Sequence, residues 1–349
     1  MTNPRWKHRP EGSNWGDFGP DDQLGRLNLL TPEKRRQAAS EIREGLAFCL
    51  SLPLDYPGGN LLNPRRYPPQ LRPTLRDGLP NMNFPLKRSD PTLIDVVCDD
   101  AALIHLQYST QWDSLAHVGQ LFDTDGDGVP EPVYYNGYRA HEHVLGPVRY
   151  KADRAVEPTH SELTGAQALG IETMAANCVQ GSAVMVDLEA HVGRERAMIG
   201  YDKLMEILET DRVAIEPGDM VCLRTGFDKV ILEMKRQPRL EPLEHSCAVI
   251  DGRDERLQRW ITDSNLVALI SDNYAVEADP ARPGHGDCAA LPLHAHCLFK
   301  LGIPLGELWH LSELADWLRA NGRNRFMLTA PPLRLPGAVG SPVTPVGTV

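Results

Sequence analysis

The stretch SAVMVDL (182–188) belongs to a set of four short apolar runs that decide the fold class. The other three are MVCLRTGF (220–227), LVALIS (266–271) and RFMLT (325–329). Each run has the length and composition of a buried strand. Patterns with helical periodicity accompany them near 201–209, 254–263, 293–301 and 312–319. Because strands alternate with helices, the sequence predicts an α/β fold.

The first ninety residues have a different, loop-rich texture. Thr31 and Pro32 are typical of a helix start, and Gly45 is typical of a helix end. Nine prolines fall within residues 53–91, which predicts an irregular arm at a surface. We therefore expect residues 1–92 to form an N-terminal helix and a Pro-rich arm, and residues 93–349 to form the catalytic domain. No Pro/Ser-rich linker separates residues 93 to 335, so the chain can also be one continuous domain.

Charge and cysteine usage limit the classes of function. The chain has 349 residues, with 36 Lys and Arg against 47 Asp and Glu, for a net charge of −11. This excess of acid argues against nucleic acid and anionic membranes as partners. The sequence has no run of 18 apolar residues, and its N-terminal segment MTNPRWKHRPEG (1–12) has no apolar stretch, so we expect no membrane span and no secretory signal. Seven scattered cysteines without a C-x-x-C pair indicate reduced thiols and a cytoplasmic location.

The segment LIHLQYSTQWD (103–113), followed by SLAH (114–117), concentrates polar chemistry. As one extended strand, it would place an apolar face on the core and five polar side chains on the other face. These five are His105, Gln107, Ser109, Gln111 and Asp113. His117 follows Asp113 by four residues, so a helical turn would bring the two together. A solvated edge strand is the alternative, but such strands usually expose Lys and Glu, so the pattern favours the floor of a pocket.

The stretch QYSTQWDSLAH (107–117) resembles the signature His-x-Gly-Thr-His-x-Asp-x-Pro-x-His of the metal-dependent cyclase family, which includes bacterial kynurenine formamidase and isatin hydrolase. Further stretches resemble the longer branch of that family, in the same order. They are SNWGDFGPDDQLGRLNLLTPEK (13–34), YYNGY (134–138), PGDMVCLRTGF (217–227), SDNYAVE (271–277), LPLH (291–294), GIPLGEL (302–308) and APPLRLPGAVGSPVTP (330–345). The resemblance implies a cyclase-like domain of the swivelling β/β/α type, with a mixed, antiparallel-rich sheet flanked by helices. It also implies a homodimer or homotetramer.

The resemblance implies a role for each matching residue. The metal-binding aspartate of the family corresponds to Asp113, and its proton-transfer histidine corresponds to His117. A later histidine and glutamate of the metal site correspond best to His294 and Glu307. His296 is the rival of His294, because LPLHAH (291–296) offers both.

Two departures from the signature change the expected metal site. Gln107 and Gln111 stand where the family has two metal-binding histidines, and an amide oxygen is a weaker, harder ligand than imidazole. We therefore expect one divalent ion, Zn or Mn, held by the aspartate, the later histidine and the glutamate, with Gln111 adding an oxygen. His105 and Gln107 are candidates for further ligands. Asp272, at the end of a strand run, is a candidate for the rim of the site.

The expected reaction is hydrolysis of an amide, lactam, ester or lactone by metal-activated water, with His117 as general acid and base. Two alternatives remain open. One is a cyclase or dehydratase-like enzyme that uses His117 without a metal, and the other is an inactive binding protein on the same fold. Nearby aromatic residues (Trp112, Tyr134, Tyr135 and Tyr138) suggest a small aromatic or cyclic substrate.

The segment LFDTDGDGVPE (121–131) matches the first half of a calcium loop. Asp123, Asp125 and Asp127 alternate as such ligands do, and they predict a structural cation, Ca²⁺, in the 123–131 loop. Tyr134 stands where the loop would need its final glutamate. An acidic hairpin turn is the alternative.

Overall fold

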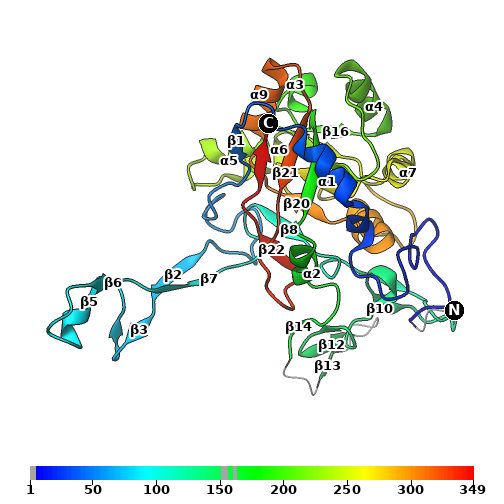
Figure 1. Ribbon diagram of the computed structural model, residues 1–349. Coiled ribbons are helices and arrows are strands. Elements are labelled where there is room, and N and C mark those ends of the chain that lie inside the picture. Colours follow the sequence, from blue (N-terminus) through cyan, green and yellow to red (C-terminus); the bar gives the residue numbers. More distant parts are fainter. Residues whose placement is uncertain (1–4, 151–155, 160–162) are drawn as a thin grey trace.

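A mixed nine-stranded sheet forms the centre of the molecule (Figure 1). The structure is a computed structural model that describes residues 5–150, 156–159 and 163–349. The strands, in spatial order, are β1 (Ala47–Cys49), β23 (Val346–Thr348), β21 (Arg325–Thr329), β15 (Gln180–Asp187), β17 (Met220–Arg224), β19 (Ala268–Ser271), β20 (Leu305–Glu307), β8 (Gln111–Asp113) and β22 (Gly340–Pro342). Strands β15, β17, β19 and β20 are parallel, and both flanks are antiparallel. The expected α/β fold with an antiparallel-rich sheet is confirmed.

Side chains along the central strands point alternately to the two faces of the sheet, and each face packs in its own hydrophobic core. On β15, Val184 and Val186 pack in one core with α4 (Tyr201–Thr210) and α7 (Glu255–Ser264). Ala183 and Met185 point to the other face and pack with α2 (Ile171–Ala176) and α9 (Ser312–Ala320). Because both faces are covered, the central strands carry apolar side chains on both faces, as the sequence pattern predicted.

Helix α1 (Pro32–Ala39) begins where the sequence predicts. Thr31 Oγ1 accepts a hydrogen bond from the backbone N–H of Lys34 at 3.3 Å, which caps the helix. The predicted end at Gly45 is wrong, because the helix stops at Ala39. Gly45 instead has a φ of +70° and donates its N–H to the Val349 carbonyl, where the chain turns into β1.

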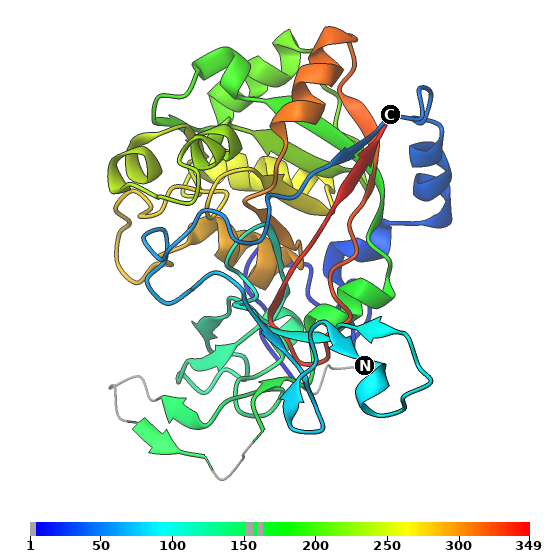
Figure 2. The same ribbon diagram turned by 90° about the vertical axis from the view of Figure 1, so that its left-hand side faces the viewer.

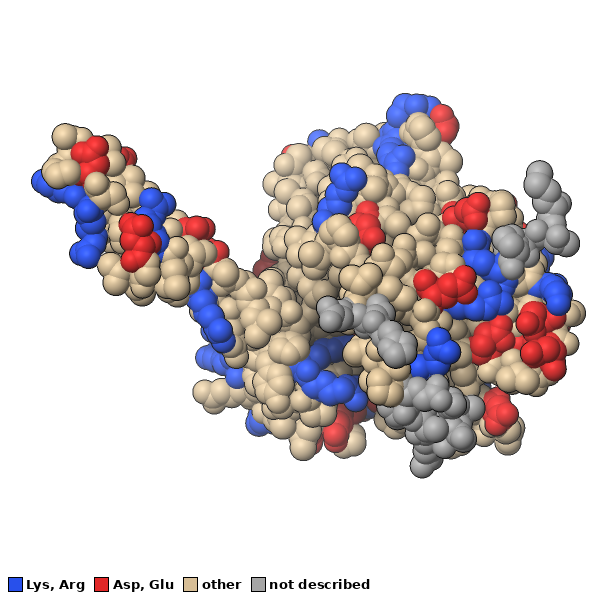
Figure 3. All heavy atoms as spheres, turned by 90° about the horizontal axis from the view of Figure 1, so that it is seen from below, with Lys and Arg blue, Asp and Glu red and all other residues tan. Residues whose placement is uncertain are grey.

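Residues 70–103 form an arm that projects from the body (Figures 1 and 2). We call it the β2–β7 arm. Its ribbons are β2 (Gln70–Pro73) with β7 (Asp100–Leu103), β3 (Leu75–Arg76) with β4 (Leu79–Pro80), and β5 (Phe84–Pro85) with β6 (Val96–Val97). The Pro-rich segment is therefore partly ordered into two-stranded ribbons. The arm exposes large apolar side chains, including Leu71, Leu75 and Ile94, and charges of both signs are interspersed along it (Figure 3).

The predicted strand over 103–113 is wrong. Strand β7 ends at Leu103, the chain turns around residues 106–107, and β8 begins at Gln111. The break has a physical reason: β7 pairs with β2 in the arm, whereas β8 pairs with β20 and β22 in the main sheet. The single polar face expected for this segment therefore does not form beyond residues 111–113.

The remaining elements are short. The helices are α3 (Glu189–Val192), α5 (Phe227–Glu233), α6 (Leu240–His245) and α8 (Pro292–His294), which continues into a π-helical segment (Ala295–Leu301). Small ribbons pair β9 (Gln120–Phe122) with β10 (Glu131–Val133), β11 (Val144–Leu145) with β14 (Gly165–Ala166), β12 (Val148–Tyr150) with β13 (Val156–Pro158), and β16 (Ala197–Ile199) with β18 (Ala248–Ile250). None of the helices in the described residues has the length and apolar character to cross a membrane. The domain boundary at residue 92 stays a prediction, although β1 already belongs to the main sheet.

Candidate active site

Three residues far apart in the sequence meet where β20 pairs with β8 in the main sheet. Asp113 lies on β8, Glu307 on the neighbouring β20, and His294 at the end of α8. One ligand atom from each of them lies within 4.8 Å of the others, and all three residues are buried. We call this group the Asp–His–Glu cluster. The pairing of Glu307 with Gln111 in the β20–β8 ladder brings Gln111 beside it.

The polar atoms of the cluster are only partly satisfied. His294 Nε2 lies 3.3 Å from Glu307 Oε1 and 3.9 Å from Asp113 Oδ2. Gln111 Nε2 donates a hydrogen bond to Glu307 Oε2 at 2.8 Å. Gln111 Oε1 and both carboxylate oxygens of Asp113 are buried without a hydrogen-bond donor among the described residues. Since buried acceptors are rarely left without a partner, these oxygens leave a place for a cation.

Glu277 holds the histidine of the cluster. Its carboxylate accepts hydrogen bonds from His294 Nδ1 at 2.8 Å and from the His294 backbone N–H at 3.0 Å. The other carboxylate oxygen accepts the backbone N–H of Leu293 at 2.9 Å. Sequence reasoning missed this role, although Glu277 ends the stretch SDNYAVE that contributed to the resemblance. The contact depends on tertiary structure, and no local pattern signals it.

Burial and charge set the protonation of the cluster. Burial raises the pKa of Asp113 to about 6, although the nearby His117 opposes this shift. Burial also acts to raise the pKa of Glu307, but the hydrogen bond with His294 outweighs it and holds that pKa below its usual range. Burial acts to lower the pKa of His294, but its bonds to Glu277 and Glu307 raise it to about 10. Without a bound cation, the histidine therefore keeps its proton at neutral pH.

His117 lies at the mouth of the cluster. A turn closed by the His117 N–H and the Ser114 carbonyl brings its Nε2 to 3.8 Å from Asp113 Oδ1. A turn, and not a helix, thus creates the predicted proximity. The His117 side chain is 21% exposed, whereas that of Asp113 is 1% exposed. The next residue, Val118, and Ala295 help to line an open cleft of about 780 Å³, whose other apolar lining residues are Leu121, Val129, Pro130, Ala289, Ala290 and Leu291.

The structure does not bring His105 into the cluster. His105 Nδ1 lies 3.0 Å from the Tyr67 carbonyl oxygen, at the base of the β2–β7 arm. Gln107 lies closer to the site, because its side chain packs on Gly340, which pairs with Asp113 in the sheet. A β-carbon on Gly340 would lie 2.5 Å from Gln107 Nε2, so a larger residue there would displace the Gln107 side chain.

Asp272 lies apart from the cluster and supports a turn. Its carboxylate accepts hydrogen bonds from the Thr225 N–H and hydroxyl and from the Gly226 N–H, at 2.7 to 2.8 Å. Burial raises the pKa of Asp272 to about 8. The donors all lie just before α5, so this geometry favours a structural role over a place at the rim of the site.

The geometry separates the two rival histidines. His294 joins the cluster, whereas His296 Nε2 lies 3.0 Å from Thr262 Oγ1 on α7. Burial lowers the pKa of His296 to about 4, so that ring is neutral. His294 is therefore the histidine that can serve as a ligand beside Asp113 and Glu307.

The acidic loop at 123–131 uses its carboxylates locally. Asp123, Asp125 and Asp127 offer oxygens within 4.8 Å of one another, but each accepts hydrogen bonds from backbone N–H groups in the loop. Glu131 is directed elsewhere, to Thr124 and Arg139. These Asx turns can shape the loop without an ion. The Ca²⁺ site stays a prediction.

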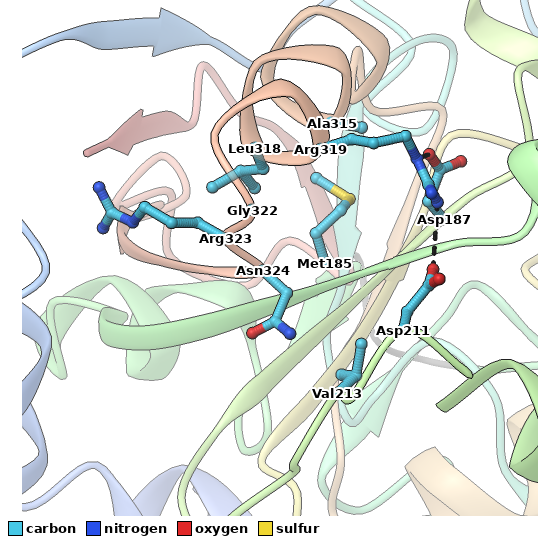
Figure 4. Close-up of a pocket in the computed structure, with 10 residues that line it drawn as sticks. All are labelled: Met185, Asp187, Asp211, Val213, Ala315, Leu318, Arg319, Gly322, Arg323 and Asn324. Carbon is cyan, nitrogen blue, oxygen red and sulfur yellow. Dashed lines mark hydrogen bonds and ion pairs between the residues drawn. The ribbon is translucent and has the colours of Figure 1, made fainter. Parts of the chain in front are cut away.

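A separate pocket of about 160 Å³ lies between α9 and the end of β15 (Figure 4). Arg319 bridges Asp187 and Asp211 there, at 2.9 and 3.1 Å. Because Asp187 is paired with Arg319 and Arg224 and Asp211 is paired with Arg319, the pocket offers no reactive group comparable to the Asp–His–Glu cluster.

Comparison with known proteins decides the family. Residues 80–278 match the protein family described as "Putative cyclase", which is more than half of the chain. The chain belongs to the cyclase family. A crystal structure described as a novel cyclase is 30% identical to this cyclase-family protein, aligns 97% of each chain and has a TM-score of 0.71. No curated protein matches the chain.

Two isatin hydrolases share the fold at lower identity. Isatin hydrolase A from Labrenzia aggregata, bound to benzyl benzoate, is 14% identical, with 89% of this chain and 94% of that chain covered and a TM-score of 0.53. Isatin hydrolase A from Ralstonia solanacearum is 16% identical, with 89% and 93% covered and a TM-score of 0.54. At this identity the likeness concerns the fold alone.

Proposed function

We propose that this cyclase-family protein is a metal-dependent hydrolase that opens an amide, lactam, ester or lactone bond. The observation that carries the proposal is the pair of donorless, buried oxygens on Asp113, next to His294 Nε2 and Glu307. A buried carboxylate without a donor is costly unless it is paired with a cation. The residue types of the Asp–His–Glu cluster and the distances between their ligand atoms fit a divalent ion.

The donor set points to the kind of ion. Asp113, Glu307 and Gln111 would supply oxygens, and His294 would supply one nitrogen. Three oxygens and one nitrogen form a harder ligand set than one rich in imidazole, so it suits Mn²⁺ better than Zn²⁺. A bound ion would supply Lewis acidity to a substrate carbonyl and lower the pKa of a water.

The residues of the chain would do the remaining work. Glu277 fixes the tautomer of His294, so that Nε2 faces the Asp–His–Glu cluster. His117, at the mouth of the cluster, would accept a proton from the attacking water and deliver it to the leaving nitrogen or oxygen. Burial of Asp113 and Glu307 excludes bulk water, which strengthens every charge interaction there.

The substrate class follows from the surroundings of His117. The cleft beside Val118 and Ala295 is lined largely by apolar side chains and is large enough for a ring. Two proteins of the same fold carry the name isatin hydrolase. Both observations support a small aromatic or cyclic amide or ester as the substrate.

We also propose that the protein is a homodimer with the β2–β7 arm as contact. Isolated two-stranded ribbons are marginally stable in water. The arm nevertheless has eight large apolar residues whose exposed fractions lie between 36% and 90%. Their exposed surface is on the order of several hundred Å², which is comparable to one side of a standard protein interface, about 800 Å² per partner. The eight residues are Leu71, Leu75, Leu79, Met82, Leu93, Ile94, Val96 and Leu103.

A substrate screen with metal control tests the hydrolase proposal. The purified chain is assayed against lactones, lactams and N-formyl aromatics, before and after chelation and after addition of Mn²⁺ or Zn²⁺. Turnover that is lost on chelation and regained with metal is expected. Turnover indifferent to chelation would favour a metal-independent cyclase or dehydratase using His117. Binding without any turnover would favour an inactive binding protein.

A further inference from the structure

Arg66 is a cation beside the Asp–His–Glu cluster that the proposed chemistry leaves without a task. Its Nη1 donates a hydrogen bond to the Gln107 carbonyl at 2.6 Å, which holds the guanidinium next to the segment leading into β8. It makes no ion pair at 4.0 Å or closer among the described residues. A guanidinium has five N–H donors, so most of its hydrogen-bonding capacity stays open.

The charge of Arg66 acts on the carboxylates of the Asp–His–Glu cluster. Burial and the neighbouring histidines have the larger effects on the pKa values of Asp113 and Glu307, and the Arg66 guanidinium also acts to lower both. Burial raises the pKa of Tyr274, and Arg66 opposes that shift as well. Arg66 therefore acts electrostatically on the Asp–His–Glu cluster and on Tyr274.

Arg66 and Tyr274 share a narrow recess of about 10 Å³, which has room for one water-sized group, such as one oxygen of a carboxylate. Its polar lining residues are Asn60, Asn63, Arg66, Gln107, Tyr108 and Tyr274, so among the described residues Arg66 is the only charged side chain in its lining. Asn63 Nδ2 donates to the Tyr274 hydroxyl at 3.0 Å, and the Tyr274 proton has no acceptor in the described part of the chain. The recess thus offers two kinds of donor to a single small anionic group.

A larger cavity adjoins the recess. It has a volume of about 350 Å³ and shares Leu62 and Tyr274 with the recess. Its apolar lining comes from Leu61, Leu62, Phe227, Leu240 and Leu243, and its charged lining residues, Arg196, Glu244 and Asp279, are of both signs. An apolar body thus fits the cavity, while an anionic end fits the recess.

We propose that Arg66 and Tyr274 form a carboxylate subsite, which binds an apolar ligand by its carboxylate while the adjoining cavity holds its body. The inference rests on the proposed function for one point, that the ligand is a substrate or product of hydrolysis. The part of the substrate on the other side of the scissile bond would then lie in the cleft beside Val118 and Ala295. A carboxylate that the substrate already carries and a carboxylate released by cleavage have the same chemistry. The experiment separates these two sources.

Calorimetric titration of the metal-loaded chain with phenylacetate and with phenylacetamide tests the subsite. The two probes have the same shape and differ in charge. We expect phenylacetate to bind at least about tenfold more tightly, because charge-assisted hydrogen bonds are the stronger ones. Arg66→Met should remove this preference, and Arg66→Lys should keep part of it. Arg65→Met is the matched control, because Arg65 is exposed and outside the recess, and it should leave the preference unchanged.

Tyr274→Phe gives a second variant in case Arg66→Met does not fold. It should weaken phenylacetate several-fold and leave phenylacetamide unchanged. Equal binding of the two probes to the unmodified chain, including no binding of either, would overturn the subsite. A preference that survives undiminished in Arg66→Met or in Tyr274→Phe would overturn it too.

Kinetics distinguish the two sources of the carboxylate. If the substrate carries it, Arg66→Met raises KM for a carboxylate-bearing ester but not for its neutral counterpart. If cleavage releases it, KM is unchanged and the inhibition constant of the product rises. The probe titration needs no turnover, so a failure of the proposed hydrolase leaves the subsite testable. Conversely, hydrolysis with no probe preference would refute the subsite alone.

Discussion

The Nδ1 atom of His294 lies 2.8 Å from Oε1 of Glu277. This hydrogen bond turns the other ring nitrogen, Nε2, toward Asp113 and Glu307. A carboxylate behind a histidine fixes the tautomer and orientation of the ring and raises its basicity, which a metal ligand requires. Four residues from separate parts of the sequence thus act as one unit.

Glu277→Gln should weaken ion binding without changing the ligands themselves. The amide cannot hold His294 as a carboxylate does, so we expect the Kd for Mn²⁺ to rise about 10- to 100-fold. Isothermal titration measures it. Glu313→Gln is the control, because Glu313 lies 3.5 Å from Nε2 of another histidine, His310, at the surface. Equal affinities in the unmodified chain and Glu277→Gln would refute the orienting role.

His117→Asn should separate chemistry from ion binding. His117 is placed to move protons, so we expect kcat to fall about 10²- to 10⁴-fold while the bound ion and the melting temperature stay the same. His105→Asn is the matched control, since His105 contacts the Tyr67 carbonyl away from the cluster. A His117→Asn variant with normal kcat would remove this residue from the mechanism.

The pH dependence of ion affinity follows from the protonation of His294. In the ion-free chain its pKa is raised to about 10, so an entering ion must displace a proton. Affinity should therefore increase with pH between 7 and 9, by up to about tenfold per unit for one proton. Titration in buffers of different ionisation enthalpy counts the protons released. A pH-independent Kd with no proton release would contradict the assignment.

Ion-free and ion-loaded chains should also differ in stability as pH rises. The pKa of histidine in an unfolded chain is about 6.5, and the folded value of His294 is higher. The stabilisation by its proton is therefore fully present below about pH 6.5 and is lost as pH rises toward 10. We expect the melting temperature of the ion-free chain to fall over this range more than that of the loaded chain. Parallel curves would count against a proton on His294.

The sequence predicted the sheet well because the signals were local. Runs such as 182–188 and 266–271 have apolar side chains on both faces, and the cores on the two faces of the sheet require this. The prediction of one strand over 103–113 was wrong, because the alternation of apolar and polar residues cannot reveal that β7 and β8 pair in different sheets. Pairing partners are a tertiary property, and the polar residues in between belong to a turn.

The sequence predicted those members of the candidate site that correspond to single positions of the family motifs. Asp113, His294 and Glu307 came from the resemblance, and the structure brings them together. Glu277 and Arg66 could not be found, because their contacts join segments that no spacing rule connects. His105 and Asp272 were named on strand position alone, and their side chains are engaged in other contacts.

Charged substitutions on the β2–β7 arm should dissociate the proposed dimer. Leu71 and Ile94 are 71% and 90% exposed, so aspartate there should cost a single chain less than about 0.5 kcal/mol in folding stability. We expect Leu71→Asp with Ile94→Asp to halve the mass measured by sedimentation. Ile42→Asp, at a 42% exposed position off the arm, should not. A monomeric unmodified chain, or a double variant of unchanged mass, would refute the contact.

The most direct test is the metal content of the purified chain after dialysis against excess Mn²⁺ and removal of loose ions. Elemental analysis of the unmodified protein and of Asp113→Asn decides it, because Asp113 supplies the two donorless oxygens and asparagine keeps their shape without the charge. We predict about one tightly held ion per chain in the unmodified protein and almost none in Asp113→Asn, with circular dichroism unchanged. An unmodified protein that holds no ion, or an Asp113→Asn variant that holds the same amount, would contradict the account.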